Sequence, residues 1–297
     1  METKKLIDCC EFISDGDHLP PPKSDSGVPF ITISNITGQN KLSFEDTMFV
    51  PESYYNGLNE NKKAQKGDIL YSVVGSFGKP VYVDFDKQMV FQRHIAILRP
   101  KRNVNARFIY YTMLNPQFYK LVDKLAIGCS QRTVTLDTLR NIEVNLPDKD
   151  IQDKMVGILS LIDEKIDINN NVNDNLEQQI QLIFDYLFPD VCAGNKHMGD
   201  FIIPKRGKSL LSKNAVHGNV PVIAGGLEPS IYHNAANTIA PVVTISSSGA
   251  NAGFVNIWGV PVWSSDSSYI DSEMSRYVYF WYAYLKRHQN NIYNIQT

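Results

Sequence analysis

Hydrophobic and polar positions follow three different patterns along the 297 residues of the chain. In residues 1–147 and 191–297, short β-branched and aromatic runs alternate with Gly, Pro and Asn, as strands and tight turns do. Each of these blocks also contains one amphipathic helical segment. Between them, apolar residues recur at helical spacing for about 40 positions. The pattern predicts an α+β protein with two β-rich domains, 1–147 and 191–297, joined by one long helix at 148–190.

Within the first block, β-branched content and alternation predict strands at 28–34, 68–74, 80–85, 90–98 and 142–146. A helix is predicted from Arg107 to Lys124 with a break near Pro116, because proline lacks the amide that a helix interior requires. The second block predicts strands near 220–224, 241–246, 253–257 and 261–270, and a helix from about Ser272 to Lys286.

The second block repeats the first. The strand–turn–strand pattern of Asp68–Val83 recurs at Val242–Ile257, 174 positions later. Upstream, 27–31 is echoed by 219–223, and downstream Ala106–Tyr111 is echoed by Ser275–Phe280. Three echoes in the same order indicate duplication of a whole domain, because solenoid repeats have periods of only about 20–50 residues.

The connecting segment begins with the capping cluster Asp148-Lys149-Asp150 and contains no proline before Pro189. At 1.5 Å per residue, a helix of this length measures roughly 60 Å. Burial inside one compact domain is the alternative, but the length favours packing of its apolar stripe on another helix or subunit. A polar tract at 169–175 interrupts the stripe, either as a register-setting layer or as a frayed stretch. The stripe consists of Ile158, Ile162, Ile166, Leu176, Ile180, Ile183 and Leu187.

Charge divides along the same boundaries. Residues 1–147 hold 18 basic and 16 acidic side chains, residues 148–190 hold 3 and 10, and residues 191–297 hold 8 and 5. Two mildly basic blocks therefore flank an acidic connector. This distribution favours anionic partners for the blocks, although ordinary variation among protein surfaces would look the same.

Sequence signals for catalysis, metal binding or secretion are missing. The four cysteines form no CxxC pair, the six histidines form no HExxH motif, and Ser246-Ser247-Ser248-Gly249 is not a GxSxG elbow. No glycine-rich loop opens a helix after a strand, as nucleotide-binding folds require. The N-terminus lacks the apolar block of a signal peptide, and no apolar run is long enough to cross a membrane. We therefore expect a cytoplasmic protein with no catalytic residue, metal or cofactor.

The chain has one domain, then a long helix, then a second domain of the same kind. This order resembles that of the specificity subunit of type I restriction-modification systems. Lys4–Asp8 running into Ile13–Gly16 resembles the start of its target recognition domain, and Lys66–Ser72 leading to Gly75–Gly78 resembles the central strand–turn–strand. Cys129–Thr133 through Leu139–Pro147 resembles the closing segment, and 151–166 resembles the spacer helix. The resemblance covers the whole chain but rests on order and pattern, since no single motif is diagnostic.

The resemblance implies a subunit without catalytic activity of its own. Each recognition domain of that family reads one half of a split double-stranded DNA site, the helical spacers dock two modification (methyltransferase) subunits, and a restriction subunit can join. Two alternative functions remain open. One is a stand-alone DNA-binding or regulatory protein with the same domains, and the other is an enzyme or carbohydrate-binding protein built on duplicated β-rich domains. The second alternative requires an acidic or histidine cluster that the sequence does not show.

Several polar residues are candidates for DNA contact. Alternation along 90–98 places Gln92 and His94 on one side of a strand and Arg93 on the other, and Arg and Gln suit bidentate contacts to guanine and adenine. Polar strand ends and solvated loop lysines are the plain alternatives. In the second copy, the positions that match 92–94 are 266–268 and begin with Asp266, so their chemistry differs. Such a difference is expected if each copy reads a different half-site, and drift at unimportant surface positions would look the same. The other candidates are Lys79, Ser130, Gln131 and Arg132 in the first copy, and Lys205, Arg206, Lys208 and Asn251 in the second.

Alignment of the copies places Thr297 opposite Gly128, so the second copy has no counterpart of 129–147 or of the helix that follows. We expect from this a truncated second domain with an exposed sheet edge. Self-association or completion by a second specificity polypeptide would then cover the apolar stripe, unless the chain is a poorly soluble product of gene rearrangement.

Overall fold

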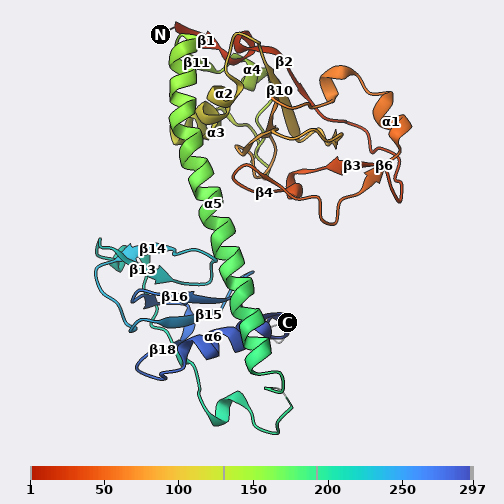
Figure 1. Cartoon of the computed structure of the whole chain (residues 1–297). Coiled ribbons are helices and arrows are strands. Elements are labelled where there is room, and N and C mark those ends of the chain that lie inside the picture. Colours follow the sequence, from red (N-terminus) through yellow and green to blue (C-terminus); the bar gives the residue numbers. More distant parts are fainter. Residues whose placement is uncertain (1, 130, 192, 295–297) are drawn as a thin grey trace. The chain divides into compact units, whose positions relative to one another are not determined.

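The computed structural model describes residues 2–129, 131–191 and 193–294 (Figure 1). The chain forms two compact units, 1–166 and 167–297, and the division falls within the long helix α5, Lys149–Leu187. This mixture of short strands and helices with one long helix confirms the predicted α+β class.

In the described residues of unit 1, short strands form four sheets and are accompanied by four short α-helices. The strands are β1 (Glu2–Lys5), β2 (Cys10–Asp15), β3 (Val28–Ile31), β4 (Ile36–Gly38), β5 (Lys41–Leu42), β6 (Phe49–Val50), β7 (Ile69–Ser72), β8 (Pro80–Tyr82), β9 (Val90–Phe91), β10 (Ile95–Pro100) and β11 (Glu143–Leu146). The helices are α1 (Glu52–Asn56), α2 (Ala106–Leu114), α3 (Pro116–Leu125) and α4 (Leu136–Asn141), with 3-10 turns η1 (Leu6–Cys9), η2 (Ile33–Asn35) and η3 (Glu60–Lys62).

Unit 2 is built from fewer elements of the same kinds. Its strands are β12 (Lys205–Arg206), β13 (Val220–Ile223), β14 (Ile231–His233), β15 (Val242–Ser246), β16 (Val255–Trp258), β17 (Trp263–Ser264) and β18 (Ser267–Asp271). Its helices are α6 (Val278–Arg287) and α7 (Gln289–Asn294), with 3-10 turns η4 (Met198–Asp200) and η5 (Ser212–Asn214).

Sheet topology confirms the duplication. Unit 1 has a four-stranded sheet in the order β2-β10-β7-β8, and unit 2 has one in the order β12-β18-β15-β16; both are antiparallel throughout. A second sheet is also shared, β6-β3-β9 in unit 1 and β14-β13-β17 in unit 2. In each, the central strand pairs antiparallel with one neighbour and parallel with the other. The same order and pairing directions occur in both units, as a duplicated domain requires.

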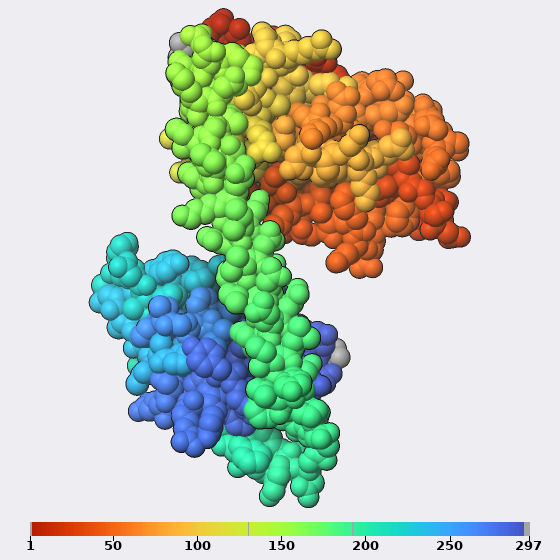
Figure 2. Space-filling view, viewed as in Figure 1, coloured from red at the N-terminus to blue at the C-terminus, as the bar shows by residue number. Residues whose placement is uncertain are grey.

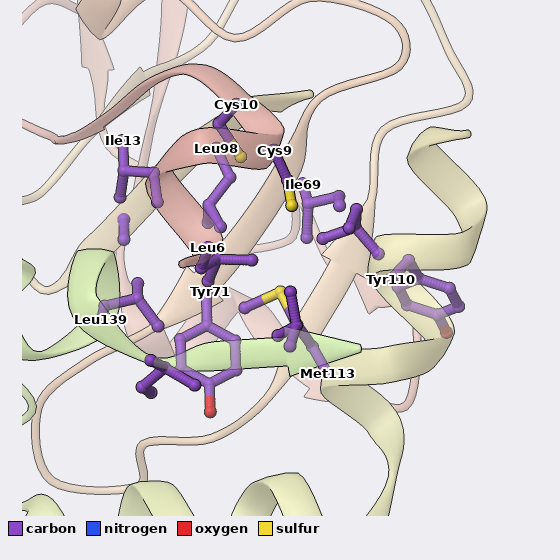
Figure 3. Close-up of a cluster of buried hydrophobic side chains, with 14 of the residues drawn as sticks. Leu6, Cys9, Cys10, Ile13, Ile69, Tyr71, Leu98, Tyr110, Met113 and Leu139 are labelled. Carbon is purple, nitrogen blue, oxygen red and sulfur yellow. The ribbon is translucent and has the colours of Figure 1, made fainter. Parts of the chain in front are cut away.

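The core of unit 1 lies between the four-stranded sheet, η1 and helices α2 to α4 (Figure 3). Leu6, Ile69 and Tyr71 are fully buried there, and Val156 of α5 closes one side of the cluster. In unit 2, a smaller cluster joins Val243 and Ile270 of the sheet to Tyr282 of α6. Each unit therefore has a hydrophobic core of its own.

Two segments that the sequence predicts as single strands each divide into two strands in the structure. The segment 90–98 is not one strand, because β9 pairs with β3 in one sheet and β10 pairs with β2 and β7 in another. The chain crosses between sheets through a turn at 92–94, where the Ile95 amide donates to the Gln92 carbonyl at 3.0 Å. Segment 261–270 divides in the same way into β17 and β18. The helix expected from Ser272 begins only at Val278, because the residues before it form turns. In the first of these turns the Met274 amide donates to the Asp271 carboxylate.

Candidate functional site

The turn between β9 and β10 presents the first group of candidates. The Gln92 amide donates to the Ile31 carbonyl at 2.9 Å, and the Arg93 amide donates to the Asp17 carbonyl at 2.9 Å. Two neighbouring segments therefore fix the backbone of the turn. The Arg93 side chain is exposed, while those of Gln92 and His94 are half-buried. Because these residues form a turn, the alternation expected from a continuous strand does not decide where their side chains point.

A loop from the C-terminal part of unit 1 brings Gln131 to the same place. Ile127 and Thr133 exchange backbone hydrogen bonds of 2.9 and 2.8 Å, which closes the loop. The Gly75 amide then donates to the Arg132 carbonyl at 2.9 Å, which ties the loop to the turn between β7 and β8. Ser130 lies outside the described residues.

Together the two segments form a polar cleft of about 290 Å³, lined by Asp15, Arg93, His94 and Gln131 among others. A second cavity of about 350 Å³ adjoins the same turn and includes Gln92, Arg93 and His94 with His18 and Lys23. The structure thus brings together four candidates, Gln92, Arg93, His94 and Gln131, from parts of the sequence about 40 residues apart. We call the surface of these four residues the unit 1 cleft.

The cleft combines the Arg93 guanidinium and the Asp15 carboxylate with uncharged polar side chains. Burial, with a smaller contribution from the charge of Arg93, lowers the pKa of His94 below its ordinary value. His94 is therefore uncharged at neutral pH, and its Nε2 lies 3.5 Å from Nε of Arg93. The cleft consequently offers a guanidinium, a carboxylate, a neutral imidazole and carboxamide groups, which are hydrogen-bonding groups suited to planar polar partners.

Two other candidates of unit 1, Arg132 and Lys79, do not line this cleft. The Arg132 guanidinium forms an ion pair with Asp123 of α3, also bonds the Asp123 carbonyl, and lies over the Phe77 ring at 5.6 Å. These contacts give Arg132 a role in holding the loop to α3. Lys79 is exposed at the start of β8, and its amide donates to the Ser72 hydroxyl at 3.0 Å.

Unit 2 places a different chemistry at the equivalent turn. Between β17 and β18, Asp266 is half-buried, accepts a hydrogen bond from the Ser248 hydroxyl, and its carbonyl accepts the Ser247 amide at 3.2 Å. Asn251 is half-buried in the turn that follows β15. Lys205 and Arg206 are exposed on β12, which pairs with β18, and Lys208 is exposed just beyond it. An acidic turn therefore replaces the arginine turn of unit 1.

Helix α5 carries the second candidate surface. In the part that belongs to unit 1, Ile158, Ile162 and Ile166 are at least half exposed. In the part that belongs to unit 2, Leu176, Ile183 and Leu187 are more than half exposed and Ile180 is 36% exposed. The green side chains of α5 can be followed on the surface in Figure 2. The whole predicted stripe is thus accessible; we call these seven residues the α5 stripe.

A different face of α5 packs against the units, and the sequence pattern did not identify it. Buried Gln152 accepts the Asn105 amide at 2.9 Å and donates to the Pro147 carbonyl at 2.7 Å, and Tyr111 donates to Asp163 at 2.7 Å. In unit 2, Glu177 bonds Lys286 at 2.8 Å, and buried Phe184 packs on Phe280 with ring centroids 5.4 Å apart. Polar residues anchor much of this face, so hydrophobic periodicity gave no signal for it.

Clusters of metal-ligating side chains and membrane-spanning helices are both absent from the described part of the chain. No group of three or more His, Cys, Asp or Glu side chains is placed there to hold a metal ion. No helix in those ranges combines the length and apolar character needed to cross a membrane.

Comparison with known proteins gives consistent similarities. A family model described as the type I restriction modification DNA specificity domain matches residues 1–178. The chain is 28% identical over 189 residues to the specificity subunit of the type I restriction enzyme HindI from Haemophilus influenzae, an alignment covering 60% of this chain and 41% of that protein. It is 26% identical over 169 residues to the MjaVIII specificity subunit of Methanocaldococcus jannaschii, covering 55% and 39%.

These alignments span about two fifths of the length of the curated relatives. Among solved structures, the S subunit of a type I restriction-modification system from M. genitalium superposes with a TM-score of 0.53 at 18% identity. That superposition covers 99% of this chain and 78% of that one. The two proteins share a fold.

Proposed function

The chain belongs to the type I restriction-modification DNA specificity family, and on that premise we propose that it recognises double-stranded DNA for a modification complex. The unit 1 cleft is the proposed reading site. Arg93 supplies a bidentate donor that suits guanine, and Gln92 or Gln131 supplies the paired donor and acceptor that suit adenine. The observation that carries the proposal is the convergence of Arg93, His94 and Gln131 on one polar cleft.

The second unit is proposed to read another half-site. Its turn between β17 and β18 carries Asp266, whereas the equivalent turn of unit 1 carries Gln92, Arg93 and His94, and a carboxylate is suited to accept from cytosine. Exposed Lys205, Arg206 and Lys208, with Lys79 in unit 1, are proposed to contact phosphates. Two heads with the same topology and different reading residues support an asymmetric, bipartite target.

The α5 stripe is proposed to dock methyltransferase subunits, which supply the chemistry that this chain is not proposed to perform. Seven accessible aliphatic side chains on one helix support this role, because an apolar surface of that kind marks an interaction site. A restriction subunit would join through the same assembly.

Mapping of methylated sites tests the reading site. The chain is co-expressed with the methyltransferase subunit of its own system, and Arg93→Ala is expected to lower affinity for the target by about tenfold to a hundredfold, the range for one bidentate base contact. Methylation should spread to sites altered at one position. Arg102→Ala is the matched control, because Arg102 is also exposed in unit 1 and does not line the cleft. If Arg102→Ala has the same effect as Arg93→Ala, general charge and not base reading explains the loss.

Salt dependence tests the phosphate contacts. Each neutralised phosphate releases condensed counterions, so we expect affinity to fall steeply and linearly on logarithmic axes as salt rises. Replacing Lys205, Arg206 and Lys208 together with Ala should make the slope shallower by about 3. Fluorescence anisotropy of labelled duplex DNA across a salt series measures both quantities. A slope that the triple replacement leaves unchanged would rule out these three contacts.

A further inference from the structure

Unit 2 contains an apolar groove of about 430 Å³ beside α6. One wall is formed by Tyr277, Phe280, Trp281 and Tyr284, and the other by the chain that precedes β12, including Lys196. Tyr277 is 55% exposed, and Phe201 on the opposite wall is 68% exposed. An open aromatic surface of this kind is a place where another polypeptide can bind.

In unit 1, strand β11 lies along the corresponding helix face and forms a wall of the cavity there. In the repeat, Tyr277, Phe280, Trp281 and Tyr284 correspond to Phe108, Tyr111, Thr112 and Asn115. All four unit 1 residues line a cavity whose wall includes strand β11 at 143–145. Covered in this way, Phe108 is 7% exposed, against 55% for Tyr277. Strand β11 therefore shows what covers this face in a copy of the same fold.

The opposite wall corresponds as well. Lys4–Asp8 of unit 1 aligns with Lys196–Asp200 of unit 2, and both segments run into a 3-10 turn, η1 and η4. In unit 1, Lys4 and Lys5 pair with Val144 and Glu143 in the antiparallel β1–β11 ladder. In unit 2, the described residues at 193–197 form no strand. The counterpart of the basic β1 segment thus has no strand partner among the described residues of unit 2.

We propose that the unit 2 groove binds a β strand of a second polypeptide with the chemistry of β11. The strand would pair antiparallel with residues 194–197 and form with them a two-stranded ladder like β1–β11 of unit 1. Its acidic residue would lie opposite His197, as Glu143 lies opposite Lys5 in unit 1. The next residue, which is apolar, would lie opposite Lys196 and cover the aromatic wall at Tyr277. This proposal does not depend on DNA recognition.

A labelled peptide with the sequence of Leu136–Pro147 provides the probe. Titration of the full chain, followed by fluorescence polarisation, should show saturable binding of one peptide per chain. Tyr277→Ala is expected to weaken binding about tenfold, because an aromatic contact surface is lost. Tyr279→Ala is the matched control: Tyr279 is 62% exposed on the same helix but does not line the groove. A peptide with Val144→Asp should bind at least tenfold more weakly.

Three results would overturn the proposal: no saturable binding, equal weakening by both tyrosine variants, or equal binding of the Val144→Asp peptide. If sedimentation instead shows a dimer of the chain that Tyr277→Ala disrupts, a second copy occupies the groove and the proposed partner is wrong. DNA affinity of Tyr277→Ala is measured in parallel and should be unchanged, so that loss of peptide binding is separated from loss of DNA recognition.

Discussion

Replacing Ile162 and Ile183 together with Asp is expected to abolish assembly with the methyltransferase subunit while both units remain folded. The two side chains are 52% and 58% exposed, so the new carboxylates stay hydrated in the free chain and cost little stability. In an assembled complex they would be buried without a partner, which costs several kcal/mol for each charge. Co-purification with the methyltransferase subunit measures assembly, and circular dichroism of the free chain measures folding.

The same helix offers a matched control. Ile168 and Leu182 are 62% and 69% exposed but lie outside the α5 stripe, so replacing both with Asp adds the same charge at similar exposure. This control pair should still assemble. Loss of assembly in both double variants would mean that added negative charge on α5, and not burial of the stripe, prevents docking. Assembly that survives the Ile162 and Ile183 replacements would place the docking surface elsewhere.

Periodicity could predict α5 and the duplication because both depend on patterns that the sequence carries locally. The stripe of α5 recurs at helical spacing without an internal proline, and the helix ends at Leu187, close to Pro189. The two copies kept their strand order, so their echoes occur in the same order as the paired strands. The long helix and the duplication could therefore be predicted without any knowledge of tertiary contacts.

The unit 1 cleft could be predicted only in part. Arg93, His94 and Gln131 were candidates by residue type, but their proximity depends on a crossing between two sheets and on backbone bonds between Gly75 and Arg132. Such contacts join positions about 40 to 60 residues apart and leave no periodic signal. The sequence also predicts Arg132 as a DNA contact, but in the structure its guanidinium is paired with Asp123. This ion pair forms across a loop and leaves no periodic signal either.

The segment Lys66–Ser72 resembles a family motif, and the structure gives it a physical role. Gly67 has a φ of +95°, a conformation that favours glycine, and it turns the chain into β7. Asp68 is 1% exposed and binds Arg99 of β10 through both oxygens, at 2.9 Å to Nε and 2.8 Å to Nη2. The motif thus anchors the start of β7 to the end of β10, at the opposite end of this strand pair from the turn of the unit 1 cleft.

Asp68→Ala is accordingly expected to destabilise unit 1 by about 3 kcal/mol, because it leaves a largely buried guanidinium without its partner. It also leaves the Gln65 amide, which donates to Asp68 at 2.9 Å, without that acceptor. The thermal midpoint of unit 1 should fall by about 10 °C. Asp84→Ala is the control, since Asp84 is an exposed carboxylate in the same unit.

The distribution of tryptophan makes this loss assignable to one unit. All three tryptophans, Trp258, Trp263 and Trp281, lie in unit 2, so their fluorescence follows unit 2 while far-UV circular dichroism follows both units. We expect Asp68→Ala to shift the dichroism transition and to leave the tryptophan transition unchanged. Replacing the pair with apolar residues, Asp68→Leu with Arg99→Met, should recover much of the stability, because no buried charge is then left alone. A double variant as unstable as Asp68→Ala would show that the loss comes from packing and not from the unpaired guanidinium.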